Sequence, residues 1–509
     1  MADTGAGSAK PTLPLSDRVT GIAVRQRLVS KGWWFTLPQT DLDSTALDAG
    51  GARLDAEFYT AETMDARKLL DSGNLNSKPL SSFADIWVLG RFKRVYTSNP
   101  SKGAPYLSAS EAFSFRPEKT RYLATDYFPN GGTRHFAKQG WILLSTSGSV
   151  GRPLLVTKRL EPFILTHDLA RIIIHPESGF LPGYVYALLA SPLGGAILRQ
   201  NKYGSSVRHL EPSHIQTLPV PKIPEREQGA VHRLIMKAYE LRDEANALLD
   251  QAAVELYRGL GLPRFDPSTA RYFSLPPSRQ FGEWDYPDPA AFEVKSSVLE
   301  ASFVADTFNP VLWAVLAALE KGTYGTVPLG PGVARCLVAP RFARVYVRPE
   351  MGIPFLQGSD IPTIRPFLLK YLSRKTPHLD LWKVQEGSVL VTCSGTIGEV
   401  AIVPKSEDGW AASQHILRVI PKENGGFNAG YIAGFLLTPY GRAQLVSYGA
   451  VVKELTSDTM KELRIPDAPR GLQNRVGEKV ERAFELKSQA IRIEDEAIQM
   501  AETAIRNLA

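Results

Sequence analysis

SGSVG at Ser147–Gly151 returns 247 positions later as SGTIG at Ser394–Gly398. In both places the pentapeptide lies between two apolar runs, WILL and RPLLV in the first case and SVLVT and EVAIV in the second. Glycine adopts positive φ without steric cost, so we predict a tight turn between two strands at each place. The recurrence in matched surroundings indicates an internal repeat.

Further matches keep nearly the same spacing, between 245 and 250 residues. They are RLDAEF at Arg53 with VLEASF at Val298, RFKRVY at Arg91 with RFARVY at Arg341, GAPYLSASE at Gly103 with GIPFLQGSD at Gly352, GYVYALLASPLG at Gly183 with GYIAGFLLTPYG at Gly430, Tyr203 with Tyr448, and LPVPKIPEREQ with LRIPDAPRGLQ, ending at Gln228 and Gln473. Because both order and spacing recur, we interpret the chain as two copies of one domain.

A long amphipathic helix is predicted after each copy. Apolar residues alternate spacings of three and four, the a/d stripe of a coiled coil. They are Val231, Leu234, Ala238, Leu241, Ala245, Leu248, Ala252 and Leu256 in the first helix, and Val476, Val480, Ala483, Leu486, Ala490, Ile493, Ala497, Met500, Ala504 and Leu508 in the second. Proline-rich stretches give both helices sharp starts. The two stripes most simply bury each other, as an antiparallel coiled coil that separates the two copies.

Within each copy, runs such as GWILLSTSG, PLLVTKR and ARIIIHP indicate short strands, and Tyr184–Gln200 indicates one helix. The predicted fold is therefore mixed α/β, with two tandem domains of the same fold. The predicted boundaries are an N-terminal extension (1–50), the first copy of the domain (51–224), a central spacer helix (225–260), a linker rich in proline and aromatic residues (261–297), the second copy of the domain (298–469) and a C-terminal spacer helix (470–509).

Composition describes an ordinary globular chain of 509 residues, with 44% hydrophobic and 22% charged residues. The net charge of +7 suits an anionic partner such as nucleic acid. With only two cysteines, Cys336 and Cys393, a disulfide framework or a cysteine zinc site is not expected. No export signal or membrane span is evident, so we expect a cytoplasmic protein.

Several catalytic motifs fail on inspection. Arg152 and Glu399 follow the two repeated turns, where a phosphate-binding loop would need lysine and then serine or threonine. Ser147 and Ser394 stand where a nucleophile elbow requires glycine. Asp288 and Glu293 are too close in sequence to lie on two strands that would bring them to one metal ion. The histidines show no zinc-ligand spacing, so we expect neither a catalytic site nor a metal.

Taken together, the RLDAEF opening, the SGSVG and SGTIG turns, the GYVYALL and GYIAGFL helices and the duplicated helix starts resemble the specificity (S) subunit of type I restriction-modification enzymes. The resemblance covers nearly the whole chain. It implies a non-catalytic DNA-binding subunit whose two target-recognition domains each read one half of a split, asymmetric DNA site. A helix of 34 residues spans roughly 50 Å, which allows half-sites separated by at most about 15 base pairs.

The resemblance further implies partners that supply the chemistry. These are double-stranded DNA, two DNA adenine methyltransferase (modification) subunits that bring S-adenosylmethionine, and restriction subunits that bring ATP and magnesium. No cofactor is expected on this chain. One alternative is an S-like DNA reader of another phage-defence system or of a methylation-only system. Another is a self-sufficient nuclease or methyltransferase with an unrecognised site.

Basic residues gather where the copies diverge, and some recur in both copies. Shared arginines are expected to contact phosphates and unshared ones base edges, while an ordinary solvated surface charge is the alternative for each. The predicted DNA-binding residues are Arg91, Lys93, Arg94, Lys119, Arg121, Arg134 and Lys138 in the first copy, and Arg341, Arg344, Lys370, Arg374 and Lys375 in the second.

Overall fold

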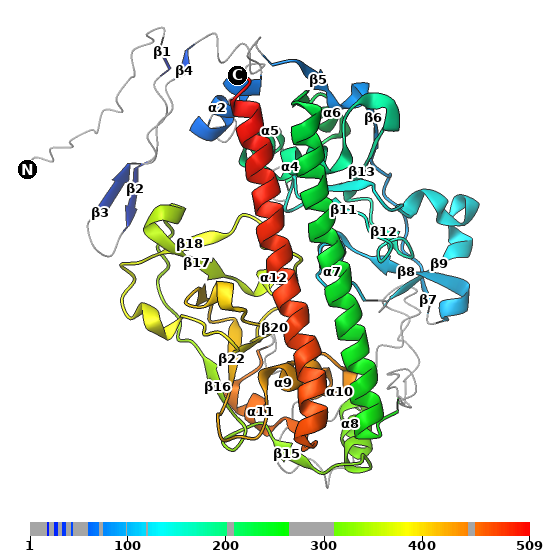
Figure 1. Cartoon of the computed structure of the whole chain (residues 1–509), viewed down its shortest axis with the longest axis vertical. Helices are drawn as coiled ribbons and strands as arrows, with labels where there is room; N and C mark the ends of the chain where they lie inside the picture. Colours follow the sequence, from blue (N-terminus) through cyan, green and yellow to red (C-terminus); the bar gives the residue numbers. More distant parts are fainter. Residues whose placement is uncertain are drawn as a thin grey trace, which may run out of the picture.

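The computed structural model describes residues 60–70, 75–97, 99–118, 121–200, 208–263, 310–445 and 454–509 (Figure 1). It also places four short strands before them, β1 (Arg18–Val19), β2 (Arg25–Leu28), β3 (Trp33–Thr36) and β4 (Leu42–Asp43), which pair β1 with β4 and β2 with β3. The RLDAEF and VLEASF segments, Tyr203 and Tyr448 lie outside the described residues, as do nearly all of the expected linker and most of the expected N-terminal extension.

The first half contains two four-stranded sheets. One has the order β11-β10-β13-β6 and is antiparallel throughout; the other has the order β12-β8-β9-β7, with β12 parallel to β8. A further antiparallel pair joins β14 to β5. The strands are β5 (Ser77–Pro79), β6 (Ala84–Trp87), β7 (Tyr96–Thr97), β8 (Gly103–Leu107), β9 (Tyr122–Ala124), β10 (Ile142–Ser145), β11 (Pro153–Leu155), β12 (Ile164–Leu165), β13 (Leu169–Ile174) and β14 (Pro219–Pro221).

The second half repeats this topology. Its sheets have the orders β20-β19-β22-β16 and β21-β17-β18, again with one parallel pair, β21 with β17, and β15 pairs with β23. A bridge between Tyr346 and Leu372 replaces the β7–β9 pairing of Tyr96 with Leu123. The strands are β15 (Thr326–Pro328), β16 (Ala334–Val338), β17 (Gly352–Leu356), β18 (Lys370–Ser373), β19 (Val389–Thr392), β20 (Val400–Ile402), β21 (Ala411–Ala412), β22 (Ile416–Pro421) and β23 (Arg464–Pro466). The predicted mixed α/β class is confirmed.

Helices complete each half. They are α2 (Ala61–Leu70), α3 (Ala109–Ala112), α4 (Pro182–Ala190), α5 (Pro192–Gln200), α6 (Pro212–Gln216) and α7 (Glu225–Leu260), then α8 (Pro310–Glu320), α9 (Ala429–Leu436), α10 (Pro439–Arg442), α11 (Ser457–Glu462) and α12 (Arg470–Arg506). The prediction of one helix over Tyr184–Gln200 is wrong. Ser191 takes an extended conformation, with ψ of 156°, because the residue before a proline is disfavoured in the α region, and the chain divides into α4 and α5 there.

The repeated pentapeptide is the predicted glycine turn in both halves. Gly148 and Gly151 have φ of 70° and 82°, and Gly395 and Gly398 have φ of 76° and 90°. In the first half the turn joins β10 to β11, which pair antiparallel. Left-handed φ values are costly for residues with a Cβ atom, so these glycines are needed for backbone geometry.

Helices α7 and α12 lie side by side along the long axis of the molecule (Figure 1). Gly259 lies against Leu472, Glu255 pairs with Arg475, and Arg242 pairs with Glu494, so numbers fall along one helix as they rise along the other. The helices therefore run in opposite directions. Both begin directly after a proline, Pro224 and Pro469, as the sequence predicts.

Each half packs a helix closely on its own long helix. A Cβ atom on Gly430 of α9 would lie 2.3 Å from the carbonyl oxygen of Gly477 on α12. At the equivalent place in the first half, a Cβ atom on Gly183 of α4 would lie 2.7 Å from the Cα atom of His232 on α7. Backbones can approach this closely only where no side chain intervenes, so both glycines are needed for packing.

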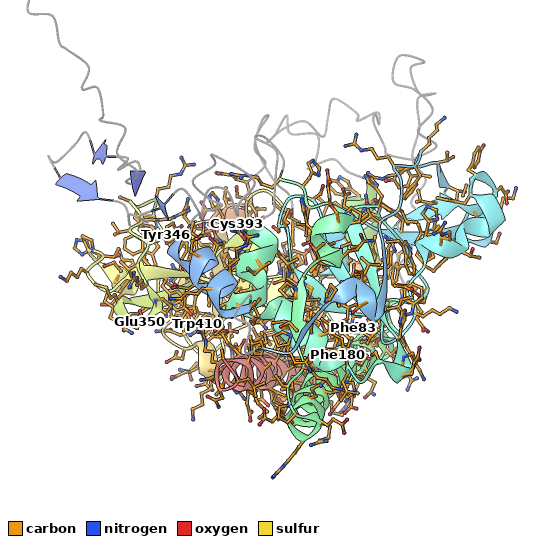
Figure 2. The ribbon with its side chains drawn as sticks, turned by 90° about the horizontal axis from the view of Figure 1, so that it is seen from above. Phe83, Phe180, Tyr346, Glu350, Cys393 and Trp410 are labelled. Atoms are coloured by element: carbon orange, nitrogen blue, oxygen red, sulfur yellow. The ribbon has the colours of Figure 1, made fainter. Side chains whose placement is uncertain are left out.

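The cores of the two halves lie on either side of the helix pair. Seen along the helices, the pair occupies one edge of the molecule and the halves spread from it in opposite directions (Figure 2). In the first half Phe83 stacks on Phe180, with ring centroids 3.9 Å apart. The buried strands β10 and β19 carry apolar side chains that are almost fully inaccessible to solvent. Burial on both faces explains why these strands read as continuous apolar runs.

The two halves also touch each other directly. Ser114 and Thr363, which occupy equivalent positions, form an antiparallel bridge. The amide of Phe115 donates to the carbonyl of Pro362 (2.7 Å), and that of Ile364 donates to the carbonyl of Phe113 (3.0 Å). The two halves are therefore joined directly as well as through the long helices, because their backbone groups satisfy one another midway along the pair.

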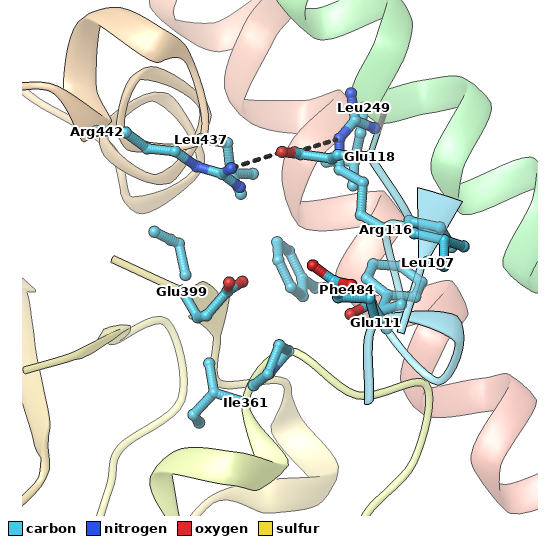
Figure 3. A pocket seen from close by; sticks show the side chains of 15 residues that line it. Leu107, Glu111, Arg116, Glu118, Leu249, Ile361, Glu399, Leu437, Arg442 and Phe484 are labelled. Atoms are coloured by element: carbon cyan, nitrogen blue, oxygen red, sulfur yellow. Dashed lines mark hydrogen bonds and ion pairs between the residues drawn. The ribbon is translucent and has the colours of Figure 1, made fainter. Parts of the chain in front are cut away.

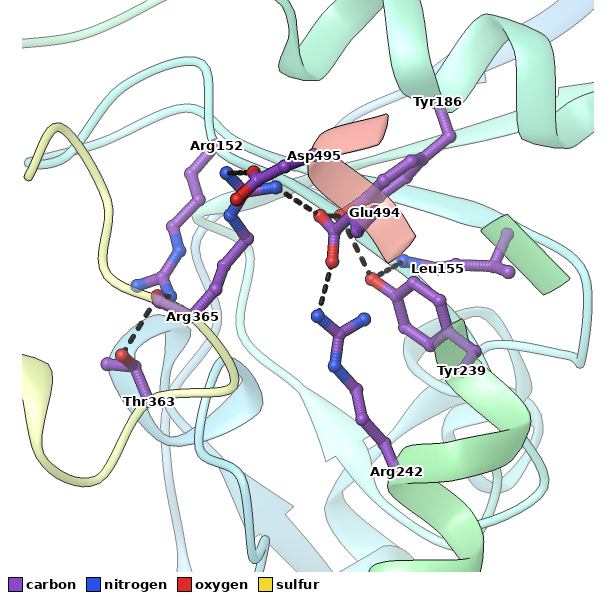
Figure 4. A network of polar contacts seen from close by, with 9 residues as sticks. All are labelled: Arg152, Leu155, Tyr186, Tyr239, Arg242, Thr363, Arg365, Glu494 and Asp495. Atoms are coloured by element: carbon purple, nitrogen blue, oxygen red, sulfur yellow. Dashed lines mark hydrogen bonds and ion pairs between the residues drawn. The ribbon is translucent and has the colours of Figure 1, made fainter. Parts of the chain in front are cut away.

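A buried ion network, the Glu494 node, lies beside this bridge (Figure 4). Glu494 on α12 is fully buried, pairs with Arg242 of α7, and accepts hydrogen bonds at 2.7 Å from Tyr186 and Arg365. Burial by itself would raise the pKa of Glu494, but Arg242 and Arg365 overcome it and hold that pKa well below its usual range. The carboxylate therefore stays charged and bonded to both halves.

We predict that enlarging Gly430 separates α9 from α12. The variant Gly430→Val is expected to lower the free energy of unfolding by about 3 kcal/mol, because the new side chain overlaps backbone atoms that cannot move independently. Gly471→Ala is the control, since its Cβ atom would meet only the Arg475 side chain at 3.6 Å. Urea denaturation followed by circular dichroism measures both. Equal effects of the two substitutions would contradict the close packing.

A second prediction concerns Lys487 of α12, whose Nζ donates to the carbonyl of Ile361 (3.3 Å). Burial lowers its pKa from 10.5 to about 8, although Glu407, Asp360 and Glu399 oppose the shift. The folded state thus binds the Lys487 proton less tightly than the unfolded state, which lowers the free energy of unfolding at neutral pH. This loss of stability disappears as the pH rises from 8 to 10.5, where Lys487 becomes neutral in both states.

Lys487→Met should therefore raise the free energy of unfolding by about 2 kcal/mol at pH 7 and change it little at pH 10.5. Urea denaturation of wild type and variant at both pH values provides the measurement. A difference between the two proteins that is the same at both pH values would show that Lys487 is solvated in the folded chain.

Candidate nucleic-acid interface

The basic residues common to both halves lie on matching loops. Arg91, Lys93 and Arg94 are exposed on the segment between β6 and β7. Arg341 is exposed on the corresponding segment between β16 and β17, where it lies 3.7 Å from Glu454. The β7–β9 and β17–β18 regions lie on opposite sides of the α7–α12 pair (Figure 1).

An arginine covers an aromatic ring at the same place in each half. The guanidinium of Arg94 lies 5.5 Å from the ring centroid of Tyr106, and that of Arg344 lies 5.4 Å from that of Phe355. Tyr106 and Phe355 occupy equivalent buried positions on β8 and β17. The ring faces attract the cations, so the shared arginines are positioned by the fold before any ligand binds.

A second pair of predicted residues is also equivalent, although the sequences around them diverge. Arg121 precedes Tyr122 of β9, and Lys370 precedes Tyr371 of β18. Arg121 pairs with Glu111 and lies 5.4 Å from the Tyr106 ring centroid, whereas Lys370 lies 4.9 Å from the ring centroid of Tyr346 and 3.3 Å from Gln357. The same position therefore carries a planar guanidinium, that of Arg121, in the first half and a compact ammonium group, that of Lys370, in the second.

A third position differs in hydrogen-bonding chemistry. Arg171 and Arg418 are equivalent, which places His167 opposite Gln414 in the repeat. Gln414 accepts a hydrogen bond from Arg344, and the positive charge of Arg94 acts on His167. Burial lowers the pKa of His167, and Asp168 only partly opposes this. The shared arginine thus acts on an imidazole by its charge in one half and donates a hydrogen bond to an amide in the other.

We call these sets the Tyr106 cluster (Arg94, Tyr106, Arg121 and His167) and the Phe355 cluster (Arg344, Phe355, Lys370 and Gln414). The remaining predicted residues lie outside them. Arg134, Lys138, Arg374 and Lys375 are exposed on loops or short helical turns, and Lys119 lies outside the described residues. The structure therefore groups Arg94 and Arg121 around the Tyr106 ring, whereas Arg344 and Lys370 lie over two neighbouring rings, those of Phe355 and Tyr346.

Two functional candidates that the sequence analysis did not single out are the buried arginines Arg171 and Arg418. Arg171 is fully buried and donates to the carbonyls of Thr166, Leu169, His135 and Leu165, while Arg418 donates to those of Lys383 and Leu381. Burial lowers the pKa of Arg171 to about 10. Each arginine fixes the loops around its cluster. The sequence signal for these two residues was an arginine within an otherwise apolar strand, in ARIII and in ILRVI.

A cavity of about 180 Å³ lies between the halves (Figure 3). Glu118 spans it by pairing with Arg442 at 2.7 Å and lying 3.9 Å from Arg116. Burial raises the pKa of Glu399 in its wall; Arg442 lowers this pKa and Glu118 raises it. The cavity thus combines ion pairs with an apolar floor that includes Phe484.

Within the ranges given above, no group of three or more histidine, cysteine, aspartate or glutamate side chains is placed to hold a metal ion. Cys336 and Cys393 are unpaired and buried, and burial raises the pKa of each to about 11. These thiols are protonated at neutral pH and are poor nucleophiles. Among the same residues, no helix has the length and apolar character to cross a membrane.

Comparison with known proteins gives a family match in the second half. Residues 349–486, from the short turn before β17 into α12, match the family model described as the type I restriction modification DNA specificity domain. Over these residues the second half is similar to a type I specificity domain. The resemblance drawn from the repeated turns and helix starts is thereby confirmed.

Solved structures of specificity subunits also match. The S subunit of a type I restriction-modification system from M. genitalium is 12% identical, and the match covers 86% of this chain and 97% of that one with a TM-score of 0.33. The HsdS subunit from Thermoanaerobacter tengcongensis is 14% identical, with 86% and 98% covered and a TM-score of 0.27. A search of curated proteins found no match.

Proposed function

We propose that this chain is the DNA-binding specificity subunit of a type I restriction-modification complex and reads a bipartite, asymmetric site. The observation that carries the proposal is that the two halves, one of them a specificity domain, present the same arginine-covered ring at equivalent positions. A pseudo-two-fold pair of readers on antiparallel helices suits two half-sites on one duplex. Internal duplication gives this chain two DNA-reading domains, which dimeric DNA-binding proteins obtain from two identical subunits.

Asymmetry of the target follows from differences within the matched clusters. Arg121 corresponds to Lys370, and His167 corresponds to Gln414. A glutamine amide suits adenine and an arginine fork suits guanine in the major groove. Arg94 and Arg344, being shared, contact phosphates, whereas the unlike positions contact bases. The two halves therefore prefer different base sequences on the same backbone.

The chemistry of the complex belongs to partner subunits in this proposal. Two DNA adenine methyltransferase subunits bring S-adenosylmethionine, and restriction subunits bring ATP and magnesium. The chain scaffolds these subunits and binds double-stranded DNA, with the spacer helices α7 and α12 forming the antiparallel coiled coil between the two target-recognition domains. It carries no cofactor and works in the cytoplasm.

We predict that Arg94→Ala and Arg344→Ala each weaken binding of the chain to duplex DNA without changing its base preference. Each variant is expected to lose one phosphate contact, so the slope of log Kd against log salt should fall by about 1. Fluorescence anisotropy across a salt series measures this slope. Lys237→Ala is the control, because Lys237 is an exposed residue of α7 near Glu240. Unchanged affinity and slope in both arginine variants would exclude these arginines from the interface.

A further prediction separates a reader from an enzyme. The purified chain, given DNA and S-adenosylmethionine with a radioactive methyl group, should transfer no label until a modification subunit is added. Mapping of methylated adenines in cells that hold the complex should then show two unlike half-sites at a constant gap. Label incorporated by the chain alone would identify it as a methyltransferase.

A further inference from the structure

We propose that the Glu494 node sets the gap between the two half-sites, so that Glu494, Arg242 and Tyr186 are positioning residues for DNA recognition. The inference rests on the proposed function and deepens it. It adds to the length of the two helices a specific set of side chains that fixes their register.

The seam between α7 and α12 includes large buried side chains, such as Leu241 and Leu486, and Glu255 pairs with Arg475 at its edge. The seam also contains buried alanines on both helices, Ala238, Ala245, Ala252, Ala483, Ala490, Ala497 and Ala504. Small side chains of this kind do not interlock as larger knobs do, whereas a buried polar pair in such a seam is a known way to fix register. Arg242 and Glu494, which are 3% and 0% exposed, are a pair of this kind.

Glu494 joins three separate parts of the molecule at once. Arg242 comes from α7, Tyr186 from α4 of the first half, and Arg365 from a loop of the second half. Arg152 of the first half also donates to the carbonyl of Arg365 at 2.8 Å. Sliding one helix by a turn, about 5.4 Å, would break these contacts together and leave charges buried without partners. Such a state is disfavoured strongly.

The Glu494 node is not repeated at the position that the pseudo-two-fold rotation makes equivalent to it. Gln228 corresponds to Gln473, an offset of 245, and the same offset pairs Leu249 with Glu494 and Arg242 with Lys487. Leu249 lines the cavity described above, with Glu399 at the position equivalent to Arg152. The same location in the other half therefore has no carboxylate that corresponds to Glu494. Of the two equivalent locations, the Glu494 node is therefore the one that adds a buried carboxylate to the contacts that fix the register.

The gap in the DNA follows from the register of the protein. One base pair moves a half-site by about 3.4 Å along the axis and turns it by roughly 35°. A protein body with fixed halves cannot follow both changes without losing contacts in one half. The contacts between the two halves then decide how strongly the chain prefers the natural gap over gaps that differ by one base pair.

The test uses the chain with its modification subunits and the target found by mapping methylated adenines. Duplexes carry the two half-sites at the natural gap, one base pair shorter and one base pair longer. The double variant Arg242→Met with Glu494→Leu replaces the charge pair by apolar groups, a change that buried pairs often tolerate. Arg242→Lys keeps the charge, and Asp495→Asn removes the exposed neighbour that pairs with Arg365 at 2.8 Å.

Wild type, Arg242→Lys and Asp495→Asn should bind the natural gap about tenfold more tightly than either altered gap. The double variant should bind all three within about twofold while retaining its circular dichroism spectrum. If the double variant does not fold, Tyr186→Phe is measured instead, and its discrimination should fall at least about threefold. A folded double variant, or Tyr186→Phe, that keeps the wild-type discrimination would overturn the inference. Wild type that binds every sequence equally would overturn the proposed function itself.

Discussion

The packing of α7 against α12 is the constraint on which the rest of the molecule depends. Each helix follows one copy of the repeat, and each has an apolar stripe that must be removed from water. Antiparallel pairing buries both stripes and at the same time relates the two copies by a pseudo-two-fold rotation. The glycine contacts at Gly183 and Gly430 then bind each half to its own helix in the same way. Placement of the two candidate interfaces on opposite sides of the pair follows from this packing.

The two halves share their backbone contacts but differ in the side chains at equivalent surface positions. Arg171 and Arg418 donate to backbone carbonyls in both halves, and such contacts are indifferent to the side chains around them. Positions that face outward beside the shared arginines differ instead. The same separation holds at the junction, where backbone hydrogen bonds around Ser114 and Thr363 are nearly symmetric, but the Glu494 node has no equivalent at Leu249. The two copies therefore have the same fold but different surface side chains, and the Glu494 node makes the contact between them asymmetric.

The repeat, the glycine turns, the mixed α/β class and the starts of both long helices could be predicted from sequence, because each depends on local pattern. Four features could not be predicted from sequence. The break at Ser191 depends on one residue before a proline within an otherwise continuous apolar pattern. The equivalence of Arg121 and Lys370 is hidden by divergent neighbours and becomes visible only from strand pairing. The Glu494 node joins residues far apart in the chain, and a glutamate within a helix rich in charge gives no sign of burial. Heptad positions alone also did not predict the buried face of α7, since Arg242 and Asn246 are buried against the two halves as well.

The central claim is that the two halves form one body, joined by the helix pair, the Ser114–Thr363 bridge and the Glu494 node. Spin labels on cysteines placed at Tyr127 and Leu381, which are 69% and 52% exposed and belong to different halves, report on this directly. Distance measurement by pulsed electron resonance on the free chain should give one narrow distribution, unchanged when DNA is added. A broad distribution that narrows only with DNA would show that the halves move independently and that the DNA, not the protein, sets their separation.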